Sequence, residues 1–319
     1  IASCVKAHPN EIYFTAGGSE SNNIVLRGIL KSGDHLIISA IEHPAILQPA
    51  KELENNGIEL TILDPDANGQ IPPESLETAI KANTRLVSIM MANNELGTMN
   101  DINSLAIISK KSGALFHTDA VQAIGKISLN LSEMDVDFLS ASAHKFYGPK
   151  GNGFLYMKKG LSLDGIVTGG GQEKGLRAGT ENTAGIAGLG KAMELAYSNL
   201  DENHKHILSL ENQFLTGLNE AKIEFRRNGI NQLPGLFNLT FFGIKGQTLI
   251  LNLDLKGIAI SYGSACASGT AKPSAIFSKI GIPVAEAEST VRISFSWNNT
   301  KNDITSLVQA LTEIIPILK

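Results

Sequence analysis

The chain has 319 residues, of which 43% are hydrophobic and 18% are charged, so it can bury a substantial core, is not a disordered segment and is expected to form two domains. Its 27 basic and 31 acidic residues give a formal net charge of −4 without a long basic block, which argues against direct binding to nucleic acid. The two cysteines exclude a disulfide framework, and no apolar run approaches the roughly 18 residues of a membrane span, so a soluble protein of the reducing cytoplasm is predicted.

The first half of the chain alternates short apolar runs with segments of helical period. The runs that predict strands are Glu11–Thr15, His35–Ser39, Glu59–Leu63, Arg85–Met91, Ala114–His117 and Asp137–Ser140. The segments that predict helices are Ser21–Leu30, Ala45–Asn55, Glu74–Lys81 and Ile102–Lys111, with Gly33, Gly57 and Gly113 at expected helix stops. This alternation predicts an α/β fold with a mainly parallel sheet, helices on both faces, and ligands bound beyond the carboxyl ends of the strands.

The second half has a different rhythm. A glycine-rich stretch, Gly169–Gly179, precedes a long region of helical character from Ala184 to Ala221. Beyond it, the predicted strands are Leu236–Phe242 and Thr290–Phe295, and the predicted helices are Gln247–Leu253, Ser274–Lys279 and Ile304–Ile317. We therefore expect a large domain over residues 1–199 and a smaller α+β domain over residues 200–319.

The segment Asp137–Gly151 contains the most informative lysine. A predicted strand ends in small polar residues and is followed by His144, Lys145 and a Gly-Pro turn. Such a lysine is often only a solvated surface residue. Here Ser142 and His144 offer hydrogen-bond donors to a phosphate, and a lysine desolvated beside them can form a Schiff base with the aldehyde of pyridoxal phosphate (PLP).

A second acid-bearing segment, Phe116–Gln122, places Asp119 at the end of another predicted strand. Asp119 could simply cap the following helix. Alternatively, it could pair with the pyridine nitrogen of PLP, so that the ring accepts electrons when a bond to the substrate Cα breaks. Gln122 could reach the phenolic oxygen of the ring from the same turn.

Phosphate donors are expected where the first strand turns into the first helix. The segment Phe14–Asn23 contains Gly17, Gly18 and Ser19 at this point, and paired glycines let backbone N–H groups approach an anion at a helix start. His43 follows the second predicted strand, where it could stack on a planar ring or act as a helix cap.

Together these segments resemble the cysteine desulfurases of the NifS/IscS type, in the class V branch of PLP-dependent aminotransferase-fold enzymes. The matching boxes cover nearly the whole chain; they are Phe14–Asn23, Glu42–Pro44, Asn93–Thr98, His117–Gln122, Ser142–Gly151, Gly169–Glu173, Arg177–Asn182 and Ser264–Gly269. The resemblance implies PLP-dependent transferase fold type I, with a seven-stranded sheet in the large domain. It also implies a family length about sixty residues greater at the amino end, and we expect such a segment to be missing here.

The resemblance assigns the cofactor contacts. Lys145 is implied as the Schiff-base lysine, Asp119 as the pyridinium partner and Gln122 as the phenolate partner. His43 is implied to stack on the ring and is counted with Lys145 and Cys266 as catalytic. The implied phosphate-binding residues are Gly18, Ser19, Ser142 and His144.

The remaining matches concern substrate and partners. Asn94 and Arg292 match positions that bind the substrate carboxylate, and a guanidinium suits that role through a bidentate fork. Thr180 matches a residue that reaches the cofactor phosphate of the neighbouring subunit, which implies a homodimer. Cys4 is interpreted as a structural cysteine on a helix.

Cys266 lies in a run of small residues, Ser261–Ala271, that offers little apolar anchoring. A free cysteine is usually a buried small hydrophobe, whereas an exposed thiolate here could take the sulfur of L-cysteine as a persulfide and release L-alanine. The implied acceptors are an Fe–S scaffold protein or a tRNA-thiolation enzyme. The alternatives are a selenocysteine lyase, another class V enzyme such as an aminotransferase, and an inactive paralogue that acts as a scaffold.

Overall fold

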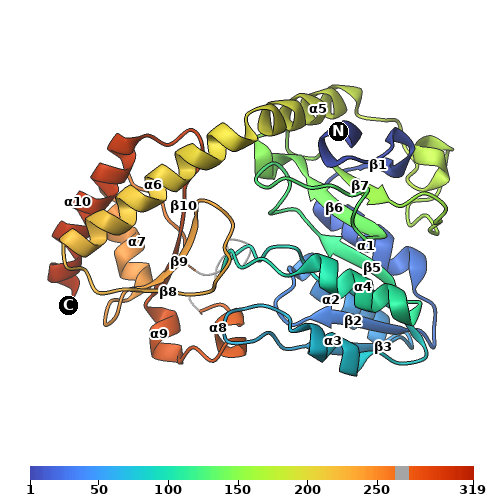
Figure 1. The fold of residues 1–319 in the computed structure, drawn as a ribbon, viewed down its shortest axis with the longest axis horizontal. Helices are drawn as coiled ribbons and strands as arrows, with labels where there is room; N and C mark the ends of the chain where they lie inside the picture. Colours follow the sequence, from blue (N-terminus) through green and yellow to red (C-terminus); the bar gives the residue numbers. More distant parts are fainter. Residues whose placement is uncertain (263–272) are drawn as a thin grey trace. The chain divides into compact units, whose positions relative to one another are not determined.

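The computed structural model describes residues 1–262 and 273–319. They form two compact units (Figure 1). Unit 1 comprises Ile1–Pro65, Gln70–Asn93 and Asn100–Leu200, and unit 2 comprises Asp66–Gly69, Asn94–Met99 and Asp201–Lys319. Two short segments inserted in the sequence of unit 1 therefore fold with the carboxyl-terminal part of the chain. Within the described ranges, no helix has the length and apolar character needed to cross a lipid bilayer.

Unit 1 contains a seven-stranded sheet. Its strands are β1 (Ile12–Thr15), β2 (His35–Ser39), β3 (Glu59–Leu63), β4 (Thr84–Ser88), β5 (Leu115–Asp119), β6 (Phe138–Ser142) and β7 (Gly153–Met157). Their spatial order is β1-β7-β6-β5-β4-β2-β3. The pairs from β3 to β6 are parallel, and β7 runs antiparallel to β6 and β1. The predicted mainly parallel α/β sheet is confirmed.

Helices cover both faces of this sheet. They are α1 (Gly18–Ile29), α2 (Pro44–Glu54), α3 (Pro73–Ala79), α4 (Ile102–Ser112) and α5 (Thr183–Ser198). Helix α4 shows the local signals clearly: the Asp101 side chain accepts a hydrogen bond from the Ser104 N–H, and Gly113 ends the helix at a φ of 82°. The predicted helix stop at Gly113 is confirmed. Glycine suits this position because it adopts a left-handed backbone conformation with little strain.

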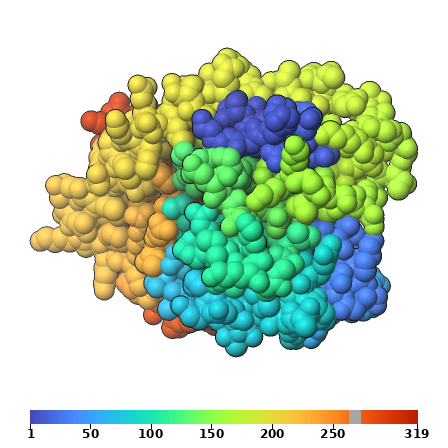
Figure 2. Space-filling view, turned by 45° about the vertical axis from the view of Figure 1, so that its right-hand side comes forward, coloured from blue at the N-terminus to red at the C-terminus, as the bar shows by residue number. Residues whose placement is uncertain are grey.

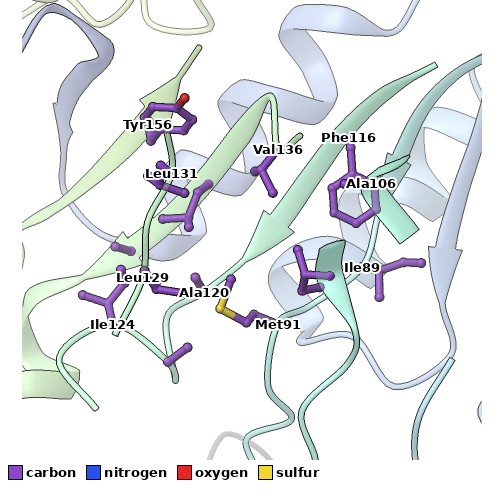
Figure 3. Packing of buried hydrophobic residues seen from close by; sticks show 14 of the residues in the cluster. Ile89, Met91, Ala106, Phe116, Ala120, Ile124, Leu129, Leu131, Val136 and Tyr156 are labelled. Atoms are coloured by element: carbon purple, nitrogen blue, oxygen red, sulfur yellow. The ribbon is translucent and has the colours of Figure 1, made fainter. Parts of the chain in front are cut away.

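The alternation of side chains along the strands separates two hydrophobic clusters. One face contributes Ile37, Val87 and Phe116 to a cluster that includes residues of α4 and α5, and Figure 3 shows Phe116 packed near Ile89 and Ala106 within it. The opposite face contributes Leu36, Leu86 and Phe138 to a cluster that includes residues of α1 and α2. A sheet buried on both faces explains why its strands read as nearly continuous apolar runs.

The amino-terminal residues pack onto unit 1 as short 3-10 turns, η1 (Ala2–Val5) and η2 (Pro9–Glu11). The Leu131 N–H donates to the Val5 carbonyl oxygen at 2.9 Å, and η1 contacts α5. Figure 2 shows these residues in dark blue against the green and yellow-green parts of the same unit. Cys4 lies in η1 and is half-buried. The helix predicted at this point is a single 3-10 turn.

Unit 2 is built on a small antiparallel sheet in the order β10-β9-β8. Its strands are β8 (Arg226–Arg227), β9 (Leu236–Thr240) and β10 (Thr290–Ser294), and its helices are α6 (Leu200–Glu220), α7 (Gly246–Asp254), α8 (Ile276–Lys279), α9 (Val284–Glu288) and α10 (Lys301–Leu318). Phe214, Phe237 and Phe295 meet edge to face, with ring centroids 5.3 to 5.4 Å apart. Unit 2 therefore combines an antiparallel sheet with helices, an α+β arrangement.

Candidate functional site

The carboxyl ends of β1, β5 and β6 lie along one edge of the sheet in unit 1. Asp119 of β5 is paired with Ser140 of β6, so Asp119 and Ser142 end neighbouring parallel strands. Strand β7 pairs Gly153 both with Ser142 and with Thr15 of β1. The segments that follow β1, β5 and β6 therefore leave the sheet at the same edge.

The turn after β1 is closely packed against this edge. A Cβ atom at Gly18 would lie 2.5 Å from Val121 Cγ2, and one at Gly17 would lie 3.3 Å from Ser142 Oγ. Glycine is thus required at position 18 for the turn to approach β5 and β6. The same turn begins the 12-residue helix α1, whose first N–H groups and dipole favour an anion.

Lys145 lies on a short 3-10 turn, η3 (Ala143–Phe146), directly after β6. Phe146 is buried and anchors the turn, whereas His144 and Lys145 are exposed. The Ser142 hydroxyl lies 3.0 Å from His144 Nδ1. Partial desolvation lowers the pKa of His144, and the charges of Lys145 and Lys150 lower it further, so a neutral imidazole is favoured.

Asp119 is a buried carboxylate with defined donors. It accepts hydrogen bonds from Asn22 Nδ2 at 2.7 Å and from the Val121 N–H at 3.0 Å. Burial raises the pKa of Asp119, while these two hydrogen bonds and the positive charges of His43 and Lys145 lower it. Asp119 ends β5 and Lys145 follows the neighbouring strand β6, and the charges of Lys145 and His43 both act on Asp119.

His43 has a double local role. Its Nδ1 accepts a hydrogen bond from the Ala45 N–H at 3.1 Å, which caps α2, and Pro44 occupies the first position of that helix. Burial lowers the pKa of His43, Asp119 raises it and Lys145 lowers it. The structure therefore shows the helix cap expected of His43, and its stacking on a ring stays a prediction.

Two other predicted residues of unit 1 have different surroundings. Gln122 is half-buried, and its Oε1 accepts from Lys126 Nζ at 3.3 Å. Thr180 is exposed and follows Gly179, whose N–H donates to Gln172 Oε1 at 3.2 Å. The predicted reach of Thr180 into a neighbouring subunit stays a prediction.

In unit 2 the structure brings Asn94 and Arg292 together. Arg292 Nη1 donates to the Asn94 carbonyl oxygen at 2.8 Å, and Nη2 lies 3.3 Å from Ser261 Oγ. The backbone of Arg292 also exchanges two hydrogen bonds with Ser261, so its guanidinium extends from a fixed strand position. Cys266, the predicted sulfur acceptor, lies outside the described residues.

Sequence reasoning missed three buried polar residues near this edge. Asn22 lies in the Phe14–Asn23 segment, four residues after Gly18, where a helix returns to the same face. Glu42 immediately precedes His43, is buried, and has a buried Oε2 atom without a hydrogen-bond partner. His117 lies two residues before Asp119, hence on the same face of β5. Spacing from the assigned residues was the available signal.

We expect His117 to make the fold sensitive to acid. It is fully buried between Ser88 Oγ at 2.8 Å and Ser140 Oγ at 3.0 Å, and burial lowers its pKa to about 3. Because the unfolded chain takes up this proton below its ordinary pKa of about 6.5 and the folded protein does not, stability falls as the pH falls from 6.5 towards 3.

A His117→Gln variant should lack this fall of stability at low pH, because glutamine does not titrate. Between pH 7 and pH 4, its free energy of unfolding should change by about 3 kcal/mol less than that of the parent chain. Urea unfolding at several pH values measures the difference. Equal pH dependence in the two proteins would show that the folded protein protonates His117 over the same pH range as the unfolded chain.

Comparison with known proteins gives a consistent picture. The family model described as aminotransferase class-V matches residues 1–307. A protein of Clostridium botulinum (strain Hall) named cysteine desulfurase IscS is 45% identical over 324 residues, covering 99% of this chain and 81% of that protein. A solved structure titled NifS-like protein has a TM-score of 0.92 at 35% identity, covering 99% of this chain and 86% of its own. A structure titled SspA in complex with cysteine has a TM-score of 0.82 at 37% identity, covering 94% and 85% respectively.

Proposed function

Because the chain belongs to the aminotransferase class-V family, we propose that it is a PLP-dependent cysteine desulfurase, which converts L-cysteine to L-alanine and retains the sulfur as a persulfide on Cys266. The observation that carries this proposal is the meeting of Lys145, Asp119 and His43 at one edge of the sheet, where each influences the charge of the others. Relatives named cysteine desulfurase at 41 to 45% identity support the choice of reaction.

The residues of unit 1 fit PLP in three respects. The glycine turn at the start of α1 lies so close to the segment after β5 that a side chain at position 18 would collide with Val121, which leaves backbone donors for a phosphate. Asp119 is a buried acid at the end of the neighbouring strand, suited to a protonated pyridine nitrogen. Lys145, which carries an exposed amine, lies on η3 directly after the next strand, β6.

Each part of PLP would then be bound by identified residues. The phosphate would be held by Gly18, Ser19, Ser142 and His144. Asp119 would pair with the pyridine nitrogen, Gln122 with the phenolic oxygen, and His43 would lie against the ring. Lys145 would bond the aldehyde carbon. When bound, PLP supplies an electron sink that weakens the bonds at the substrate Cα.

The chain's own groups have distinct tasks in the reaction. Burial raises the pKa of Asp119, and the hydrogen bonds from Asn22 and Val121, together with the charges of His43 and Lys145, act in the opposite direction, so the donors on this carboxyl orient it towards a protonated ring nitrogen. Lys145 Nζ, once released by the incoming substrate, accepts the Cα proton of L-cysteine and later returns a proton to the product. Arg292, oriented by Asn94 and Ser261, binds the substrate carboxylate in this proposal.

Sulfur transfer requires a nucleophile. The Cys266 thiolate attacks the sulfur of L-cysteine, a sulfur–sulfur bond forms, and the bond from substrate sulfur to carbon breaks with its electron pair left on the carbon. Reprotonation of that fragment gives L-alanine, so no external oxidant is consumed. The persulfide would pass to an Fe–S scaffold protein or a tRNA-thiolation enzyme in the cytoplasm.

Two further features belong to the proposal. We assign residues 1–199 to a large PLP-binding domain and residues 200–319 to a small domain that carries the Cys266 segment. We also assign the chain to a homodimer in which Thr180 reaches the cofactor phosphate of the other subunit, because Thr180 is exposed on a segment of unit 1 whose neighbouring residues are fixed by hydrogen bonds.

The test is alanine formation from L-cysteine by the PLP-loaded protein in the presence of a thiol reductant. Cys266→Ser is expected to abolish turnover, because a hydroxyl cannot accept the sulfur. Cys4→Ser, at the half-buried cysteine of η1, is the matched control and should retain activity. Unchanged turnover in Cys266→Ser would contradict the persulfide route, and alanine released only from selenocysteine would identify a selenocysteine lyase instead.

A further inference from the structure

We propose that Arg177 is a positioning residue for the phosphate-binding turn, acting through its ion pair with Glu20. This inference rests on the proposed function, since the phosphate concerned is that of PLP. Arg177 Nε donates to Glu20 Oε1 at 3.0 Å across 157 positions of sequence. The two side chains are 28% and 17% exposed, so the pair is largely shielded from solvent.

Glu20 is part of the turn's own framework. Its other carboxylate oxygen, Oε2, accepts a hydrogen bond from the Ala16 N–H, which closes the turn from the outside. On the inner side, Thr15 Oγ1 lies 2.8 Å from Ser21 Oγ, and the Gly17 N–H donates to Thr15 Oγ1. Glu20 therefore stabilises the turn that contains Gly18 and Ser19. A residue that fixes the Glu20 side chain also stabilises this turn.

Arg177 is well placed to hold Glu20 because its own backbone is fixed. Leu176 and Ala178 on either side are buried, and the Ala178 N–H donates to the Val167 carbonyl oxygen at 3.2 Å. Arg177 also forms a parallel β-bridge with Val167. The side chain thus extends from an anchored strand-like residue.

The preceding residues bind the same part of unit 1. Glu173 Oε2 accepts from the Phe14 N–H at 2.9 Å, and Lys174 Nζ donates to the Asn10 carbonyl oxygen at 2.8 Å while lying 4.8 Å from the centre of the Tyr13 ring. Both Glu173 and Lys174 adopt left-handed backbone angles, which side-chain-bearing residues accept only when tertiary contacts fix them. The segment as a whole is fastened onto β1 and its turn.

Charge gives Arg177 a second effect. The Glu20 carboxylate follows directly after Ser19, one of the proposed phosphate-binding residues, and would repel a phosphate dianion if it were uncompensated. The guanidinium is charged at every relevant pH and compensates it. Removing Arg177 alone should therefore weaken phosphate binding, whereas removing both charges should restore part of the affinity.

The experiment compares the affinities of the unmodified protein, Arg177→Gln, Glu20→Gln and the double variant for PLP and for pyridoxal, which lacks the phosphate. Binding is followed by the absorbance of the Lys145-linked cofactor and by its rate of release. We expect Arg177→Gln to weaken PLP binding about tenfold, an amount equal to about 1.4 kcal/mol, with pyridoxal affinity unchanged. The double variant should recover several-fold. Lys191→Gln, at an exposed ion pair on α5, is the matched control and should behave as the parent.

The outcomes separate this inference from the proposed function. Equal losses for PLP and pyridoxal, or an Arg177→Gln variant that melts earlier but binds PLP normally, would overturn the positioning role and leave the desulfurase proposal standing. If the unmodified protein binds PLP without any dependence on Lys145, or not at all, both proposals fail together.

Discussion

Replacing Lys145 by alanine is expected to lower alanine formation from L-cysteine by about 10³-fold or more, within the range of a removed acid–base group. Lys145 is exposed on η3, directly after β6, and its charge acts on both Asp119 and His43. A shorter side chain at this position leaves no amine at the edge of the sheet where the substrate Cα must lose its proton.

The matched control for this change is Lys150→Ala. Lys150 is also exposed and lies five residues further along the same loop, so it tests whether the effect follows from general loss of positive charge. Steady-state alanine production and the absorbance of bound PLP should be measured for both variants. Turnover of Lys145→Ala within tenfold of the parent would exclude Lys145 as the base.

Glu42→Gln is expected to remove most of the loss of folding stability that the parent protein shows as the pH rises from about 4.5 to about 8. Glu42 is 5% exposed, and its Oε1 accepts hydrogen bonds from Ser39 Oγ at 2.5 Å and from the Met90 N–H at 2.7 Å. Burial nevertheless raises the pKa of Glu42 to about 8, with the charge of Asp119 as a smaller cause in the same direction. The folded protein thus retains a proton on Glu42 at neutral pH.

The sign of the effect follows from linkage. The unfolded chain loses the proton above the ordinary glutamate pKa of 4.5, whereas the folded protein keeps it until about pH 8, so stability is lost as the pH rises between these values. The full loss is roughly 5 kcal/mol for a shift of this size. Glutamine has a similar shape and does not titrate, so Glu42→Gln should unfold with a nearly flat pH dependence over this range.

Urea unfolding between pH 5 and pH 8 measures this difference. Glu77→Gln, at an exposed glutamate of α3, is the matched control and should retain the slope of the parent. Parallel curves for Glu42→Gln and the parent would mean that Glu42 is already ionised in the folded protein near neutral pH.

Much of the fold and of the site's outline could be predicted from local pattern. Strands β2 and β3 and the helix stop at Gly113 agree with the sequence prediction, because apolar period and cap residues are local properties. Strand β7 was not predicted. Its five residues are all buried, so they show no alternation, and no helix precedes them to mark a βαβ unit.

The order of residues alone determined which side chains follow the ends of parallel strands, and hence that Asp119 and Lys145 share an edge, since parallel strands end on the same side of a sheet. Only the tertiary structure decided which residues distant in sequence form hydrogen bonds with the site residues and with the turn beside them. Asn22 reaches Asp119 across 97 positions, and Arg177 reaches Glu20 across 157. Such pairs depend on strand order and on the path of loops over the sheet, which local periodicity does not encode, because a hydrogen bond forms wherever folding brings donor and acceptor together.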